Sequence, residues 1–325
     1  MKIKYLALSI LLASTGAQAA TVSNTVYGKA QGQLSWQDGK DFQTQAQLVA
    51  IGNKGVYKTD DFKIIYEAEV QYSDNFAKRG LDDFELNTAR IIFASKFGAA
   101  IVGHGYSGVY SDVYKRVDIH QSNNAELSSR NKMLWEQATY AKNILAYATP
   151  SLAVGKGKLK LVGSVITPKE DNGSNDDVIS ARLVYNSANF NAAIGYVQVD
   201  KKFPANKADD DYKRYSIGAD YKFSSLTLAS MVEVNEDSFN KSENTYVGAV
   251  KYQYSSVDFG VSYQHKTYQD TTDNADQSLL IASVNYNYDE NLSFFVEGAF
   301  YGEEPALFKD TYSEDAINIG IKFKI

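Results

Sequence analysis

Cysteine is absent from this chain of 325 residues, and histidine and proline are scarce, with three and four residues respectively. The lack of cysteine excludes a disulfide framework, thiolate ligation of zinc or iron–sulfur clusters, and a cysteine nucleophile. Three histidines leave little material for a multi-histidine metal site. Past the N-terminus the chain also lacks an apolar run of the about 18 residues that a membrane-spanning helix needs. The sequence therefore fits neither a disulfide-rich domain nor a helical membrane protein.

Aromatic residues are abundant instead, with 24 Tyr and 16 Phe, and 22 Gly accompany them. This composition favours strands over helices. The 39 acidic residues outnumber the 33 basic ones and give a formal net charge of −6. Because binding to nucleic-acid phosphates requires the opposite sign of charge, we expect no nucleic-acid partner.

The N-terminus has the features of a secretory signal peptide. Lys2 and Lys4 form a basic region, residues 5–12 are apolar, and Ala17-Gln18-Ala19 supplies a small-x-small cleavage site. An apolar run of this length is too short to span a bilayer as an anchor helix. We therefore expect residues 1–19 to be cleaved and the mature chain 20–325 to be exported.

The mature chain alternates between apolar and polar residues with a period of two, as in residues 62–73. One parity of that stretch is apolar (Phe62, Ile64, Tyr66, Ala68, Val70, Tyr72), and the other is mostly polar or charged (Lys63, Ile65, Glu67, Glu69, Gln71, Ser73). Successive side chains of a strand point to opposite faces, so one face suits an apolar environment and the other suits water.

Sixteen segments of this kind can be counted. They span residues 24–37, 43–57, 62–73, 86–96, 98–106, 140–149, 157–167, 177–186, 188–199, 211–223, 225–235, 243–254, 256–268, 277–288, 291–302 and 313–325. Every second connection is tight, and the others are longer and charge-rich. An even number of strands with short turns at one end predicts an all-β fold, a 16-stranded antiparallel transmembrane β-barrel in a single domain, residues 20–325.

A soluble β-sandwich or propeller would also alternate. The apolar parity would then form a packed core rich in Val, Ile and Leu, whereas here Tyr and Phe gather at the ends of the strands, for example Tyr72, Phe223, Tyr254 and Tyr288. Aromatic residues at both ends of an outward apolar band are typical of the interfacial girdles of membrane barrels. The membrane barrel is therefore the preferred interpretation.

One connection, residues 107–139, is far longer than the rest and shows no clean alternation. Loops of that length are usually functional or disordered. Its charged residues include Asp112, Lys115, Arg116, Asp118, Glu126 and Arg130. The segment is either a solvated surface excursion or a constriction loop that folds into the barrel and places its charges opposite the wall.

Several short motifs resemble those of the Gram-negative general porins. Val26-Tyr27-Gly28-Lys29-Ala30 resembles the start of their first strand, and residues 89–94, 97–98 and 102–104 resemble their fourth and fifth strands. Residues 105–112 resemble the start of their constriction loop, and residues 143–150 resemble their sixth strand.

The resemblance implies a homotrimeric, water-filled barrel in the outer membrane, in contact with lipid and lipopolysaccharide. It also implies an inward-folded third loop whose carboxylates face a basic wall that includes Lys29 and Arg90. Parity independently assigns Lys29 to the lumen. The candidates for the pore lining and constriction are Lys29, Glu67, Glu69, Arg90, His104, Asp112, Asp118, Glu126, Arg130, Arg182 and Arg214.

The chain departs from the family pattern at three positions: Ala50 and His104 stand where the family has arginine, and Ile325 stands where its terminal phenylalanine is usual. A barrel with few wall arginines and an acidic lumen predicts weak cation preference. The predicted function is passive diffusion of ions and small hydrophilic solutes.

Two alternatives stay open. One is a sugar-specific channel, for which Tyr27, Phe295 and Tyr301 are the few lumen aromatics, and the other is a non-conducting adhesin or structural barrel. A catalytic role is not expected, because Ser262 and His265 point to opposite faces of one strand. We also expect no cofactor and no metal site, since no EF-hand spacing follows the aspartates at 209–211.

Overall fold

The computed structural model describes residues 21–73, 84–127, 133–167, 178–201, 211–238, 241–268, 276–302 and 315–325, without the side chains of 237, 238, 241 and 242. The expected signal peptide and Arg130 lie outside the described residues. None of the helices within these ranges is long and apolar enough to cross a membrane.

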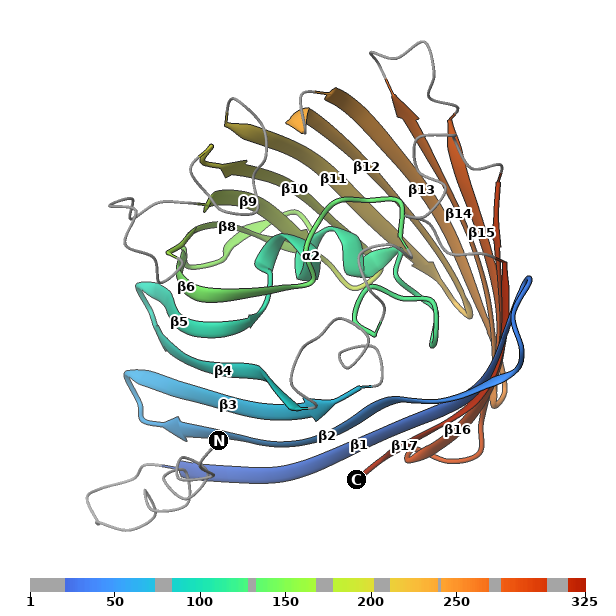
Figure 1. Cartoon of the computed structure of the whole chain (residues 1–325). Coiled ribbons are helices and arrows are strands. Elements are labelled where there is room, and N and C mark those ends of the chain that lie inside the picture. The colour runs from blue at the N-terminus through green and yellow to red at the C-terminus, as the bar shows by residue number, and fades with distance from the viewer. Residues whose placement is uncertain are drawn as a thin grey trace.

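Antiparallel strands form one closed sheet in which each strand pairs with its neighbours in the sequence and β17 pairs with β1 (Figure 1). The strands are β1 (Thr21–Gln37), β2 (Gln43–Lys58), β3 (Phe62–Tyr72), β4 (Phe84–Ser95), β5 (Gly98–Tyr106), β6 (Tyr140–Ala148), β7 (Leu152–Val154), β8 (Gly157–Ile166), β9 (Val178–Asn186), β10 (Phe190–Val199), β11 (Tyr212–Phe223), β12 (Leu226–Ser238), β13 (Lys241–Tyr254), β14 (Val257–Tyr268), β15 (Gln277–Asn287), β16 (Leu292–Tyr301) and β17 (Ala316–Lys324).

The barrel has sixteen strand positions although seventeen strands are assigned. Both β6 and the three-residue β7 pair with β8, so together they fill one position. Pro150 lies in the break between them, where a residue without an N–H cannot continue the ladder. The predicted sixteen-stranded antiparallel barrel is therefore confirmed, and the hairpin strand β7 is the addition that the alternation did not predict.

The two ends of the chain close the barrel. The N–H of Gly28 donates to the carbonyl of Ile325 and the N–H of Ile325 donates to that of Gly28, each at 3.0 Å. Pairing of the last strand with the first closes the sheet, and a closed sheet is the form in which strands can reside in hydrocarbon.

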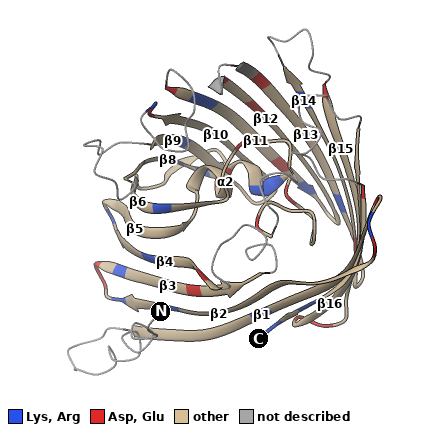
Figure 2. Ribbon diagram, in the orientation of Figure 1, with Lys and Arg blue, Asp and Glu red and all other residues tan. Residues whose placement is uncertain are grey.

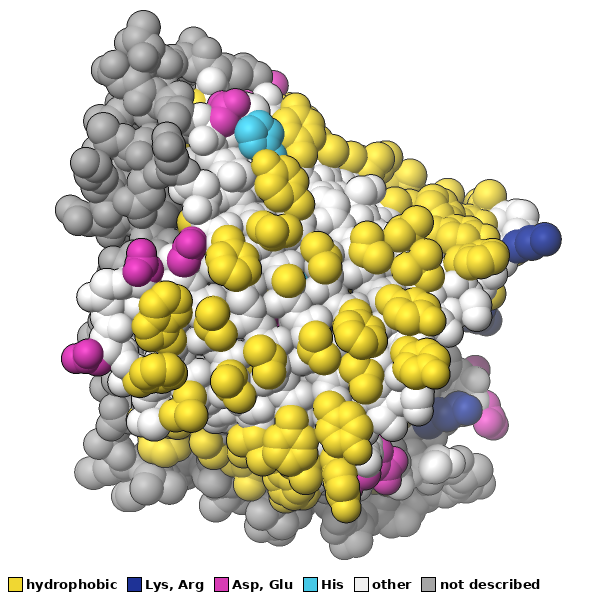
Figure 3. Space-filling view, turned by 90° about the vertical axis from the view of Figure 1, so that its right-hand side faces the viewer, with side chains coloured by type: hydrophobic (Ala, Val, Ile, Leu, Met, Phe, Trp, Pro, Cys, Tyr) yellow, Lys and Arg dark blue, Asp and Glu magenta, His cyan; other side chains and the backbone are white. Residues whose placement is uncertain are grey.

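The outer face carries the apolar parity, and Figure 3 shows apolar side chains spread over it. Aliphatic side chains such as Ile51, Ile91 and Val102 are half or more exposed there. Exposed aromatic side chains lie towards the two ends of the strands, namely Tyr57, Phe93, Tyr147, Tyr221, Phe223, Tyr252, Tyr254, Tyr286, Phe294 and Phe323 at one end and Phe84, Tyr215, Tyr246, Tyr263 and Phe300 at the other. An apolar band with aromatic side chains towards both ends is the outer surface expected of a barrel that contacts membrane lipid.

The buried apolar core lies inside the barrel rather than within the sheet. Between β5 and β6 the chain forms α2 (Gly108–Asp112) and the 3₁₀ helix η1 (Tyr114–Arg116). Figure 1 shows α2 within the ring of strands. The buried residues of this stretch cluster with inward-facing residues of β9 to β16, among them Val184, Met231 and Ile281.

Two glycines allow that close approach. A Cβ atom at Gly195 on β10 would lie 2.9 Å from a methyl carbon of Val109, and one at Gly218 on β11 would lie 2.5 Å from the carbonyl oxygen of Val113. The lack of side chains at these two positions of β10 and β11 therefore lets α2 and the residue before η1 pack directly against the backbone of the wall.

Candidate functional site: the lumen and the 107–139 segment

The 107–139 segment is held to one half of the lumen wall by buried ion pairs. The Nε of Arg182 on β9 lies 2.5 Å from Oδ2 of Asp112, and a Cβ atom at Gly108 would lie 2.2 Å from the Arg182 guanidinium, so a side chain there would displace that group. Further on, Arg116 pairs with Asp220 of β11. Arg182 is 8% exposed, so this pair is largely removed from solvent.

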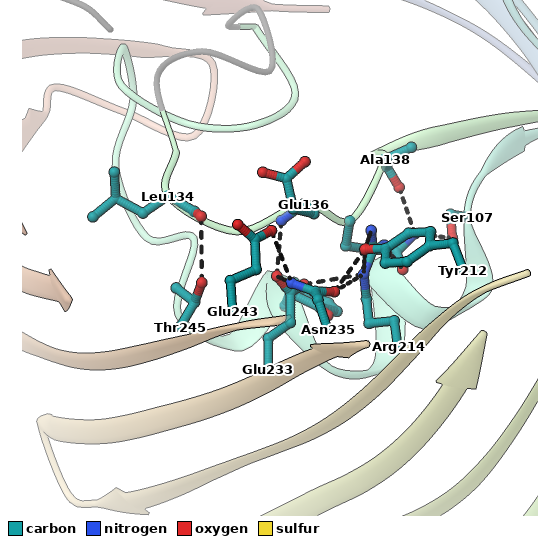
Figure 4. Close-up of polar contacts among 12 residues, drawn as sticks. Ser107, Leu134, Glu136, Ala138, Tyr212, Arg214, Glu233, Asn235, Glu243 and Thr245 are labelled. Carbon is teal, nitrogen blue, oxygen red and sulfur yellow. Dashed lines mark hydrogen bonds and ion pairs between the residues drawn. The ribbon is translucent and has the colours of Figure 1, made fainter. Parts of the chain in front are cut away.

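Glu233 on β12 is the centre of a second attachment, shown in Figure 4. Its carboxylate is fully buried and accepts the hydroxyl of Tyr114 at 2.5 Å and the backbone N–H of Glu136 at 2.9 Å. Arg214 of β11 lies 3.4 Å away and also donates to Oε1 of Gln137 at 3.0 Å. Both ends of the segment are thus joined to neighbouring strands through one carboxylate.

Lys266 on β14 extends this attachment. Its ammonium lies 2.8 Å from Glu136 of the segment and 3.0 Å from Glu243 of β13, and the side chain is almost completely buried. A buried charge without such partners would cost several kcal/mol, so the position of Glu136 is strongly restrained.

Glu297 on β16 holds the middle of the segment. Its Oε2 accepts the N–H of Gln121 at 2.8 Å and of Ser122 at 3.2 Å, and its Oε1 accepts the N–H of Asn123 at 2.5 Å and its side-chain amide at 2.7 Å. The carboxylate is fully buried. It therefore replaces water as the acceptor for three consecutive backbone N–H groups.

Beside it, His120 lies between two wall serines, with Nε2 2.8 Å from Oγ of Ser262 and Nδ1 2.9 Å from Oγ of Ser283. Burial lowers the pKa of the imidazole, which keeps it neutral and available for these two contacts.

Within the segment, Asp118 closes a local turn. Its Oδ2 accepts the hydroxyl of Tyr110 at 2.5 Å and the N–H of Ala125 at 3.0 Å, while its Oδ1 is buried without a hydrogen-bond partner. Burial raises the pKa of this carboxyl group to about 7. Glu126 accepts from the ammonium of Lys115 at 2.6 Å and from the hydroxyl of Tyr106 at 3.0 Å.

The opposite half of the wall carries charge pairs that remain partly exposed. Lys29 on β1 lies 2.7 Å from Glu69 on β3, and Arg90 on β4 lies 2.6 Å from Glu67 on β3. The side chains of Lys29 and Arg90 are each 32% exposed. Figure 2 shows basic and acidic positions side by side on this part of the barrel. Lys29 and Arg90 are thus each paired with a carboxylate of the same wall.

The predicted site residues therefore fall into two sets. Lys29, Glu67, Glu69 and Arg90 face the lumen on β1, β3 and β4. Asp112, Arg182 and Arg214 join the segment to β9 and β11, and Asp118 and Glu126 make contacts within the segment or with Tyr106. Arg182 and Arg214 have the predicted inward parity, but the segment covers them, so they differ from the expectation that they line open lumen.

His104 is misplaced by the sequence prediction. It pairs with Ala89 on the parity that also carries the outward-facing Val102, and its Nε2 lies 2.5 Å from the carbonyl oxygen of Leu86. It does not line the lumen. Glu233, Glu297 and Lys266 were missed, although their inward parity could have been read from the sequence. Within the described ranges, no group of three or more His, Asp or Glu side chains could hold a metal ion.

Comparison with known proteins gives a consistent result. A model of the Gram-negative porin family matches residues 7–305. The fold is similar to OmpF of Salmonella typhi, solved as a complex with daunomycin, at 18% identity and a TM-score of 0.76 over 93% of this chain and 97% of that one. No curated protein sequence matches the chain.

Two further solved structures share the fold. The anion-selective porin from Comamonas acidovorans aligns at 11% identity and a TM-score of 0.70, over 94% of this chain and 100% of that chain. The trimer form of OmpT from Vibrio cholerae aligns at 13% identity and a TM-score of 0.67, over the same shares of the two chains.

Proposed function

We propose that this chain, which belongs to the Gram-negative porin family, acts in the outer membrane as a diffusion channel whose solutes pass between the 107–139 segment and the wall of β1 to β4. The observation that carries the proposal is the asymmetry of the lumen. The segment packs on β9 to β16, whereas Lys29, Glu67 and Arg90 on the other wall keep side-chain exposures of 25% to 32%. Passive passage of ions and small hydrophilic solutes requires only such a hydrated route.

The assembly that we infer is a homotrimer surrounded by outer-membrane lipid and lipopolysaccharide. The apolar outer face supports contact with lipid. The structural similarity to OmpT, an outer membrane protein of Vibrio cholerae solved in a trimer form, supports the trimer. A chemical reaction is not part of the proposal, because both ring nitrogens of His120 are engaged by wall serines and one of these, Ser262, is 1% exposed.

The direct test is the conductance of the refolded mature chain in a planar lipid bilayer. A trimeric channel should give current steps that arrive in groups of three. Stable insertion without current would show a closed lumen and would contradict the proposal. A variant that lacks residues 123–130 should conduct more per channel, since part of the segment that narrows the route is removed. An unchanged conductance would place the segment outside the path of the solutes.

A further inference from the structure

Lysines of β17 and its neighbours face the lumen beside the ion pairs of β1 to β4. Lys324 pairs directly across from Lys29 of β1, and Lys322 pairs with the inward, buried Gln31. On the other side of β1, Lys54 of β2 pairs with Glu67, which faces the same lumen. Three adjacent strands therefore present lysines to one region of the lumen, which we call the β17–β2 patch: Lys29, Lys54, Lys322 and Lys324.

Of the four lysines in the patch, only Lys29 has a carboxylate partner among the described residues. Glu69 binds Lys29 and the side-chain amide of Asn87, and Glu67 binds Arg90. On the 107–139 segment, Glu126 binds Lys115. Within the described part of the chain, Lys54, Lys322 and Lys324 have no carboxylate within ion-pair distance.

The contacts that the patch does make leave its charge in place. The ammonium of Lys322 donates to Oε1 of Gln121 at 2.9 Å, which is a neutral acceptor. The ammonium groups of Lys29 and Lys54 each lie 5.3 Å from the ring centre of Tyr27. Like charges directly across a strand pair destabilise a sheet, and the ion pair with Glu69 offsets this for Lys29 but gives Lys324 no partner of its own.

The acidic excess of the chain lies elsewhere in the sequence. Fifteen of the 39 acidic residues, but only six basic ones, belong to the long connections 74–83, 168–177, 202–210, 269–275 and 303–314. The net negative charge of the whole chain is therefore a poor guide to the charge of the route.

We propose that the β17–β2 patch attracts anions, that the channel consequently prefers anions to cations, and that divalent oxyanions such as inorganic phosphate bind there weakly. The inference rests on the proposed function, because it requires an open route past the patch. Closely spaced ammonium groups in a confined lumen raise the local concentration of anions and suit an ion with several acceptor oxygens.

The test is the reversal potential of the refolded trimer in a potassium chloride gradient, with inorganic phosphate as the second probe. We expect the sign of chloride preference, and a reduction of chloride current when millimolar phosphate is added. In the double variant Lys322→Gln/Lys324→Gln the ratio of chloride to potassium permeability should fall about twofold or more, and phosphate should reduce the current less.

A matched control removes the same charge from the far wall. Lys158 and Lys160 of β8 stand two residues apart with inward parity, since Lys160 pairs with the buried Val184. Lys158→Gln/Lys160→Gln should change the permeability ratio less. Current with cation preference, equal shifts in the two double variants, or no effect of phosphate would overturn the inference while leaving the channel proposal intact. Absence of any current would overturn both.

Discussion

The two halves of the lumen wall use the same residue types in opposite ways. On β9 to β16, Arg214, Lys266, Glu233 and Glu297 are each 5% exposed or less and are bound by the 107–139 segment. On β1 to β4, the pair of Lys29 and Glu69 and the pair of Arg90 and Glu67 keep solvent contact on at least one partner. The charged residues on β9 to β16 hold the 107–139 segment in place, whereas those on β1 to β4 remain in contact with the solvent in the lumen.

Burial explains why this difference matters. Breaking a buried pair leaves an uncompensated charge and costs about 3–5 kcal/mol, whereas a partly exposed pair contributes about 1 kcal/mol or less. Substitutions on the covered wall should therefore change the position of the segment. Equivalent substitutions on the open wall should change the electrostatics of the route and leave the fold almost unaffected.

The largest effect is expected for Glu233→Ala. The change leaves Arg214 buried without its carboxylate and removes the acceptor of Tyr114 and of the Glu136 N–H, which should weaken the attachment by about 3–5 kcal/mol. Hydrogen exchange of the backbone amides in residues 107–127 should accelerate by about two to four orders of magnitude. Glu236→Ala, on the same strand with an exposed side chain, is the control and should leave these amides protected. Equal protection in both variants would contradict the assigned role of Glu233.

The sequence predicted one of these walls much better than the other. Period-two alternation predicted Lys29, Glu67 and Glu69 on the lumen side, because parity determines which face a strand residue occupies, and the family resemblance added Arg90. It could not show that Arg182 and Arg214 are covered, because the 107–139 segment has no periodicity that reveals what it packs against. Glu297 is an isolated glutamate between Phe295 and Ala299 on the inward row of β16, and only the three backbone N–H groups that donate to it reveal its role. His104 was a different failure, since its parity with Val102 already indicated the outer face.

A smaller effect is expected for Glu297→Gln. The amide group of glutamine points hydrogens towards at least one of the three N–H groups that the carboxylate accepts, so about 1–3 kcal/mol of attachment should be lost. The amides of Gln121, Ser122 and Asn123 should exchange faster, while those of α2 remain protected by the Arg182 attachment. Glu290→Gln, in an exposed turn, supplies the control. Loss of protection throughout 107–127 would show that the segment opens as one unit rather than in parts.

Asp118 should make the segment sensitive to pH. Its folded-state pKa, about 7, lies above that of a free aspartate, so the protonated form is favoured in the folded segment. The corresponding stability is present in acid and is lost as the pH rises through about 7. After correction for intrinsic rates, the amide of Ala125 should exchange faster at about pH 8 than at about pH 6. In Asp118→Asn, where no proton can leave, this difference should disappear; its persistence would assign the effect to another group.

The smallest structural effect is expected for Glu69→Gln, on the open wall. Its partner Lys29 is 32% exposed and can be hydrated, so the stability of the barrel should change by about 1 kcal/mol or less and the 107–127 amides should keep their protection.

The selectivity of the channel should nevertheless respond to Glu69→Gln, because the charge of Lys29 is no longer neutralised and the permeability ratio should move towards anions. Glu85→Gln is the control, because it removes the same charge from β4. The partner of Glu85 is Lys142, which lies 3.3 Å away and has a side chain that is 67% exposed. If Glu69→Gln loosens the segment as Glu233→Ala does, the two walls do not differ in role. Retained protection together with a shifted permeability ratio would show that Glu233 controls the position of the segment and that Glu69 controls only which ions pass.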